Sequence, residues 1–256
     1  MSQLTADISR KYKIDPDSRA DQPVDAATVI YAGSMVGKNA TTGYSRQLVG
    51  GDDFQGFADA MANNTVNPVY PNLTNLGAFI GAAGALNVGC RANGVLVTPA
   101  STIAGSPTIA NVDQAVYASD GNTLTLAQQT TTITNFNGTG GTFTLTGNSS
   151  TGSAIAWNAS AAAVVAGLPA GLVSQPVSVT GSAAGPWTLN WGPGVTPPTL
   201  TAGIGSLTGT GAAINFGTAA LTTGQSKVGT IRNVVNAGSA YAYVEVKFMA
   251  VGEKVA

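Results

Sequence analysis

The sequence contains no histidine, a single cysteine and few charged residues. Without histidine the chain cannot build a Ser-His-Asp or Cys-His catalytic arrangement, nor a zinc site with imidazole ligands. The lone Cys90 excludes an intramolecular disulfide and a multi-cysteine zinc site, and we expect it to be a small buried apolar residue. These absences remove most hydrolase mechanisms. We therefore predict that the protein is not an enzyme and needs no cofactor or metal.

Charge is also missing from one long internal stretch. Charged residues make up 9% of the 256 residues, against roughly 25% in an average soluble domain. All 11 basic and all 12 acidic residues lie outside the stretch from Gly121 to Ser226, where Gly, Ser, Thr, Asn and Pro separate short apolar runs. Charged residues resume at Lys227, just before a strong strand pattern. We predict a base domain at 26–127 and 226–256, interrupted by an inserted β-rich domain at 128–225.

Features typical of nucleic-acid and membrane proteins are absent as well. The net charge is −1 and no run of Lys and Arg is interleaved with aromatic residues, so we expect no nucleic-acid partner. The longest weakly polar run, 77–90, is shorter than the roughly 20 apolar residues of a spanning helix and contains several glycines. We expect no membrane partner. The first ten residues show no apolar signal-peptide core, which favours synthesis in a cytoplasm.

Residues 1–25 form a predicted extended N-terminal arm. Charges of alternating sign are dense there, and Pro16 and Pro23 interrupt the segment. Such a segment can be a frayed terminus, or an arm that becomes ordered by lying on a partner. The part with enough apolar and cationic content to dock comprises Arg10, Lys11, Tyr12, Lys13 and Ile14.

The base domain reads as short strands separated by turn residues, and its last strand has the clearest alternation. Ala242, Val244, Val246 and Phe248 share one face, which predicts core; Tyr241, Tyr243, Glu245 and Lys247 share the other. That second face is either solvated or a subunit contact, because tyrosine is enriched at interfaces. Earlier in the chain, apolar residues within 54–62 recur at spacings of three, one and three, which predicts a short helix capped by Asp53.

The inserted domain is predicted to be a ββαββ-type module. Asn158 or Ser160 can cap a helix that runs to about Gly167, between two pairs of strands. Trp187 and Trp191 could stack on a sugar, but they share a strand face with Leu189, which favours burial. The predicted core comprises Phe143, Leu145, Ile155, Trp157, Val164, Leu168, Val177, Val179, Trp187, Leu189 and Trp191.

Two sets of stretches resemble known proteins. The stretch DAATVIYAGSMVGKNATTGYSRQLVGGDDFQGFADAMANN, followed by GALNVGCRANGVLVTP, QAVYASDGNTLTL and SKVGTIRNVVNAGSAYAYVEVKF, resembles the capsid decoration (cement) proteins of tailed bacteriophages. GTFTLTGNSSTGSAIAWNASAAAVVAGLP with VSVTGSAAGPWTLNWGPG resembles a small β-rich module that recurs in phage virion proteins. The first likeness covers 25–127 and 226–254, and the second covers roughly 138–195.

The resemblance implies a mainly β virion structural protein with a β-barrel or β-tulip-like base. Such a protein binds the outside of an assembled capsid across subunits of the major capsid protein, commonly as a homotrimer, after synthesis in the host cytoplasm. The insert is not part of a minimal decoration protein and could be a spacer, an adhesion module or a lateral bridge. An alternative function is that of a tail- or head-associated adhesin, which would bind a host-surface glycan through Trp157, Trp187 or Trp191.

Overall fold

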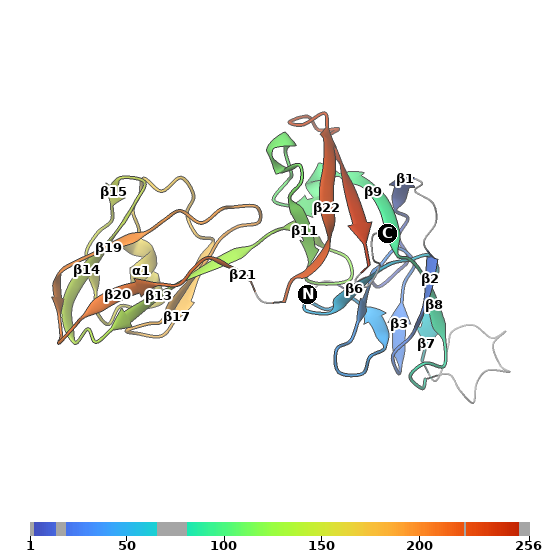
Figure 1. Cartoon of the computed structure of the whole chain (residues 1–256), viewed down its shortest axis with the longest axis horizontal. Coiled ribbons are helices and arrows are strands. Elements are labelled where there is room, and N and C mark those ends of the chain that lie inside the picture. The colour runs from blue at the N-terminus through green and yellow to red at the C-terminus, as the bar shows by residue number, and fades with distance from the viewer. Residues whose placement is uncertain (1–2, 14–18, 66–80, 223, 251–256) are drawn as a thin grey trace. The chain divides into compact units, whose positions relative to one another are not determined.

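The computed structural model describes residues 3–13, 19–65, 81–222 and 224–250, and the chain divides into two compact units (Figure 1). Unit 1 consists of Met1–Leu126 and Thr223–Ala256, and unit 2 of Ala127–Thr222. Both units are built mainly from β-strands, which confirms the predicted fold class. Within the described residues the sheets are open, and none closes into the barrel expected for the base domain.

The larger sheet of unit 1 has seven strands in the order β1-β9-β23-β22-β11-β12-β10. Its strands are β1 (Lys11–Lys13), β9 (Asn93–Pro99), β23 (Tyr243–Met249), β22 (Ser226–Val235), β11 (Ala115–Ala118), β12 (Leu124–Leu126) and β10 (Ile103–Ala104). Neighbours are antiparallel except β10 and β12. The sheet stays open because its two end strands, β1 and β10, are short and do not pair with each other. Two 3-10 turns, η2 (Ala100–Thr102) and η3 (Ile109–Asn111), belong to the same unit.

A five-stranded sheet forms the second layer of unit 1, in the order β2-β8-β6-β4-β5. Its strands are β2 (Arg19–Pro23), β8 (Asn87–Arg91), β6 (Asp53–Ala58), β4 (Met35–Lys38) and β5 (Ser45–Gln47). A two-stranded sheet pairs β3 (Thr28–Ile30) with β7 (Ala62–Asn64). Described residues of the predicted arm therefore supply one edge strand to each large sheet, β1 and β2.

The main core of unit 1 lies between the two large sheets. Phe54 and Phe57 of β6 meet Phe248 of β23, with ring centroids 6.4 and 4.9 Å from that of Phe248. A smaller cluster that includes Val36, Val88 and Cys90 contains no residue of the main core. Cys90 is fully buried, as predicted, and burial raises the pKa of its thiol to about 12.

The helix predicted over 54–62 is wrong, because this segment forms β6. Residues Val36 and Gly56 pair, but the next pair is Gly37 with Phe54, so Gln55 is an extra residue in a β-bulge. The bulge brings Phe54 and Phe57 to the same core, with their rings 5.4 Å apart, although they are three residues apart in sequence. Gly56 has a φ of 128°, and a Cβ there would collide with the carbonyl of Arg91.

Unit 2 contains a five-stranded and a four-stranded sheet with one short helix. The first sheet has the order β17-β18-β13-β20, with β21 also paired to β13; in the second, β14 pairs with β15, β16 and β19. The strands are β13 (Gln129–Phe136), β14 (Gly140–Gly147), β15 (Ser150–Thr151), β16 (Ile155–Ala156), β17 (Ser178–Gly181), β18 (Trp187–Asn190), β19 (Thr201–Thr208), β20 (Ala213–Phe216) and β21 (Ala220–Leu221).

The predicted helix of the insert is confirmed as α1 (Ala161–Ala166), with Ser160 as its N-cap. The Ser160 hydroxyl accepts a hydrogen bond from the N–H of Ala163 at 3.3 Å. Most predicted core residues are buried, but Val177 is 69% exposed, and Trp157 and Val179 are half-buried. Val177 lies just before β17, the edge strand of its sheet, where only β18 is a neighbour and the side chain stays open to solvent. None of the helices in the described ranges has the length and apolar character needed to cross a bilayer.

Candidate interaction surface

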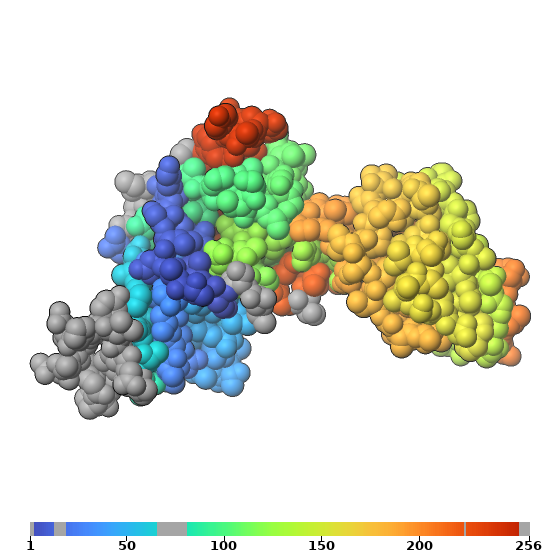
Figure 2. Space-filling view, turned by 180° about the vertical axis from the view of Figure 1, so that it is seen from behind, coloured from blue at the N-terminus to red at the C-terminus, as the bar shows by residue number. Residues whose placement is uncertain are grey.

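The start of the N-terminal arm is held against unit 1 by its own hydrogen bonds. The N–H of Leu4 donates to Gln47 Oε1 at 2.9 Å, and Gln47 Nε2 donates back to the Leu4 carbonyl at 3.0 Å. Further along, the N–H of Ile8 donates to the carbonyl of Ala32 at 3.0 Å. Leu4 is buried. Figure 2 shows the arm, in dark blue, lying along the surface of unit 1.

Arg10 is anchored inside this contact. Its Nε donates to the carbonyl of Gly33, and its Nη2 donates to the carbonyl of Asn122 at 3.5 Å. The guanidinium carbon lies 5.1 Å from the centroid of the Phe57 ring, within the range of a cation–π contact. Burial lowers the pKa of Arg10 below its usual value, but a guanidinium remains protonated in proteins. Arg10 therefore keeps its charge while it fixes the arm.

Tyr12 packs into the aromatic cluster of unit 1. Its ring centroid lies 5.8 Å from both Phe57 and Phe248, and the guanidinium of Arg91 covers the ring at 4.5 Å. Burial raises the pKa of the Tyr12 hydroxyl, and the nearby Arg10 and Arg91 only partly offset this shift. The strand that carries Tyr12, β1, pairs with β9 through Lys11 opposite Val97 and Tyr12 opposite Leu96. The aromatic side chain thus belongs to the core.

The five residues predicted to dock on a partner consequently have different surroundings. Arg10 and Tyr12 are engaged within unit 1, whereas Lys11 is exposed. Lys13 lies in β1, and Ile14 lies outside the described residues. Alternation explains the difference between Lys11 and Tyr12, because successive residues of a strand point to opposite faces of the sheet.

The predicted contact face of β23 is only partly exposed. Tyr241, just before the strand, is 84% exposed, Tyr243 is half-buried and Lys247 is exposed. Glu245 is 5% exposed, which corrects its assignment to an accessible face. The strand lies between β9 and β22, with Glu245 opposite Val97 on one side and Asn233 on the other. Neighbouring strands on both sides limit solvent access even on the outer face.

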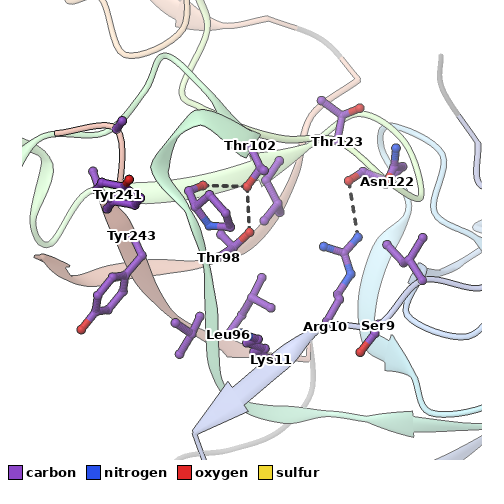
Figure 3. Close-up of a pocket in the computed structure, with 16 residues that line it drawn as sticks. Ser9, Arg10, Lys11, Leu96, Thr98, Thr102, Asn122, Thr123, Tyr241 and Tyr243 are labelled. Carbon is purple, nitrogen blue, oxygen red and sulfur yellow. Dashed lines mark hydrogen bonds between the residues drawn. The ribbon is translucent and has the colours of Figure 1, made fainter. Parts of the chain in front are cut away.

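Residues of the two predicted sets line one groove of unit 1, with a volume of about 780 Å³ (Figure 3). Arg10 and Lys11 come from the arm, Tyr241 precedes β23, and Tyr243 is the first residue of β23. The remaining lining residues are Ile8, Ser9, Leu96, Val97, Thr98, Pro99, Thr102, Asn122, Thr123, Leu124, Ala240 and Ala242. Among the described residues that line the groove none is acidic, so this lining is mainly apolar with two cations.

Two threonines give one wall of the groove a defined hydrogen-bonding character. Thr102 Oγ1 donates to the Pro99 carbonyl at 2.7 Å, and the hydroxyls of Thr98 and Thr102 are 2.7 Å apart. A hydroxyl has one proton, so Thr98 must donate to Thr102. Both oxygens retain lone pairs and can still accept. The threonine wall therefore offers acceptors, while Arg10 and Lys11 offer positive charge.

The sequence did not reveal Thr98, Thr102 or Asn122 as members of a site. Thr98 ends a strand pattern, Thr102 lies in an uncharged turn, and Asn122 is part of an Asp-Gly-Asn hairpin turn that reads only as a structural signal. They meet because β9 and the β11–β12 hairpin belong to one sheet, which local patterns do not specify.

The tryptophans of unit 2 are unsuited to stacking on a ligand. Trp187 and Trp191 are buried, as predicted, at 0% and 1% exposure. Their indole N–H groups donate within the unit, to the Ala159 carbonyl and to Thr131 Oγ1, both at 3.1 Å. Trp157 is half-buried. The adhesin alternative names Trp157, Trp187 or Trp191, and a glycan site on the face of Trp187 or Trp191 would need the core of unit 2 to open.

Comparisons with known proteins assign no family. No family model matches the chain, and no significant match was found among curated proteins. In the part of the chain that the structure describes, no three His, Cys, Asp or Glu side chains form a group that could hold a metal ion. One solved structure, a chain from Mycobacterium phage Patience, aligns over 97% of this chain and 99% of its own length, with 16% identity and a TM-score of 0.32. A TM-score at that level does not establish a shared fold.

Proposed function

We propose that the protein is a structural component of a tailed-phage virion that decorates the outer surface of the capsid and stabilises it. The observation that carries this proposal is the way in which the decoration-like stretches fold. They are separated by the whole insert, yet they form one unit with one main core, in which β11 pairs with β22 through Val116 and Gly229. The stretches that resemble decoration proteins thus fold together as one structural unit.

The proposed mechanism is binding across seams between subunits of the major capsid protein. A protein that binds a surface present only in the assembled shell stabilises the shell by RT ln(1 + [L]/Kd), where [L] is the concentration of the free protein. At a free concentration one hundred times Kd this amounts to about 2.7 kcal/mol. A standard protein interface buries about 1,600 Å². In a homotrimer, three such contacts would act together through effective concentration. Unit 2 would then serve as a spacer or a bridge.

A direct test is to add the purified protein to capsids that lack it. We expect saturable co-sedimentation and a higher melting temperature of the shell, and capsids that already carry the protein serve as the saturated control. Absence of saturable binding, or unchanged melting of fully decorated shells, would contradict the proposal. We do not propose the adhesin function, because two of its three candidate tryptophans, Trp187 and Trp191, are buried and the third, Trp157, is half-buried.

A further inference from the structure

The groove of unit 1 has the size of a ligand site and no assigned occupant. Its volume of about 780 Å³ falls within the roughly 300–1,000 Å³ of clefts that hold compact ligands. The arm, β9, the β11–β12 hairpin and the β22–β23 hairpin all contribute to it. A volume of this size, with a partly apolar lining, can hold a short stretch of polypeptide.

Charge indicates which polypeptide would fit. Of the sixteen lining residues in the described part of the chain, Arg10 and Lys11 are charged and none is acidic. Glu245 shares the row of Lys11 and Val97 across the sheet, but it is buried and does not line the groove. The groove therefore complements a carboxylate.

Hydrogen-bonding capacity distinguishes a peptide from a free anion. Thr98 donates its hydroxyl proton to Thr102, and Thr102 donates its own to the Pro99 carbonyl, so these two side chains can only accept. An inorganic anion would find no donor there, whereas the N–H groups of a peptide backbone would find acceptors. Pro99 has no N–H and its carbonyl already accepts from Thr102, which disfavours recognition by an added β-strand at this point.

We propose that this groove binds a short extended segment of a protein partner that carries an aspartate or glutamate next to apolar residues. Lys11 pairs with the carboxylate, the threonine wall accepts from the backbone, and Tyr241 covers the segment. Tyr241 suits this role because the residue is 84% exposed and lines the groove, and tyrosine is enriched at interfaces. The inference rests on the proposed function in that the partner there would be the capsid protein.

The experiment uses the full chain and immobilised eight-residue peptides with blocked ends. In one library a central position is Asp, in the second Asn and in the third Lys, with the other positions random. We expect the Asp library to retain the protein on the order of fivefold better than the Asn library. This ratio should decrease as the salt concentration rises. Lys11→Glu should abolish this preference and shift it to the Lys library, and Tyr241→Ala should weaken retention on the Asp library. Lys38→Glu, at an exposed lysine of β4 outside the groove, is the matched control and should behave as wild type.

Equal retention on the Asp and Asn libraries, or a preference that survives Lys11→Glu, would overturn the groove proposal. Co-sedimentation of the same variants with capsids tests the groove proposal and the proposed capsid decoration separately. Capsid binding by the wild type without any Asp preference refutes the groove proposal and leaves capsid decoration standing. An Asp preference that depends on Lys11 in a protein that ignores capsids supports the groove and contradicts decoration.

Discussion

The stability of unit 2 should not depend on pH. No residue from 127 to 222 is Asp, Glu, Lys, Arg, His, Tyr or Cys, so the unit has no side chain that titrates. The slope of the unfolding free energy against pH is set by the difference in bound protons between the unfolded and folded states. With no titrating group in either state this difference is zero. We expect the unfolding free energy of unit 2 to change by less than about 0.5 kcal/mol between about pH 3 and about pH 9.

Unit 1 should behave differently, because it holds all the charged residues. Burial alone would raise the pKa of Asp25, but hydrogen bonds from Asn39 at 3.0 Å and Thr42 at 2.9 Å, with the N–H of Ala26, lower it overall. A carboxylate with a lowered pKa contributes stability that is present above its unfolded value, about 3.9, and is lost as the pH falls through the folded value. Acid should therefore destabilise unit 1.

The sequence provides separate probes for the two units. All three tryptophans lie in unit 2, and all seven tyrosines lie in unit 1. Urea unfolding is followed by tryptophan fluorescence, excited where tyrosine does not absorb, and by the near-UV circular dichroism of tyrosine. For comparison, one carboxylate whose pKa is about two lower in the folded than in the unfolded state contributes about 2.7 kcal/mol. A tryptophan transition that moves with pH by that much would refute independent behaviour of unit 2.

Two further predictions use matched substitutions within one unit. Tyr12→Ala should lower the unfolding free energy of unit 1 by about 2–4 kcal/mol, because two ring contacts and one cation–π contact are lost. Tyr241→Ala, at an exposed residue, should change it by less than about 0.5 kcal/mol; similar losses in both variants would mean that the arm is not packed. Gly141→Ala should destabilise unit 2 by about 1–3 kcal/mol, because φ is 77° and a Cβ would meet the Ser206 carbonyl. Gly205→Ala, where a Cβ meets nothing within 4 Å, is its control in tryptophan-monitored unfolding.

Alternation in the last strand of the base domain predicted its inner face well. Val244, Val246 and Phe248 are buried, and Ala242 packs against the same core. The same pattern failed for Glu245, because a period of two separates the faces of a strand but does not tell whether the strand is central. In β23, neighbours on both sides bury the charged residue that an edge strand would expose.

The helical spacing of apolar residues in 54–62 predicted a helix wrongly for a related reason. One extra residue in a bulged strand changes the spacing of core-facing side chains from two to three. Phe54 and Phe57 then satisfy a helical template although they lie in β6. Gly56 lies between them and has a positive φ, which favours glycine. This glycine was the sequence signal for the bulge, because an isolated glycine in a strand pattern favours one. In the insert, by contrast, the alternation of Trp187, Leu189 and Trp191 continued without a bulge and predicted burial correctly.

The position of the arm bears on which residues can face a partner. The contacts of Arg10 and Tyr12 with unit 1 would have to be replaced if a capsid subunit were to draw the arm away. Loss of the aromatic contacts of Tyr12 alone costs a free energy comparable to that which a typical single side-chain contact supplies at a protein interface. An arm that stays on unit 1 presents Lys11, rather than Arg10 or Tyr12, to the outside. Docking through the groove and docking through a released arm therefore predict opposite results for Tyr12→Phe, which keeps the ring and removes the hydroxyl. If the capsid binds the groove, Tyr12→Phe should leave capsid binding unchanged. If the arm is released and the Tyr12 hydroxyl contacts the shell, the same substitution should alter capsid binding.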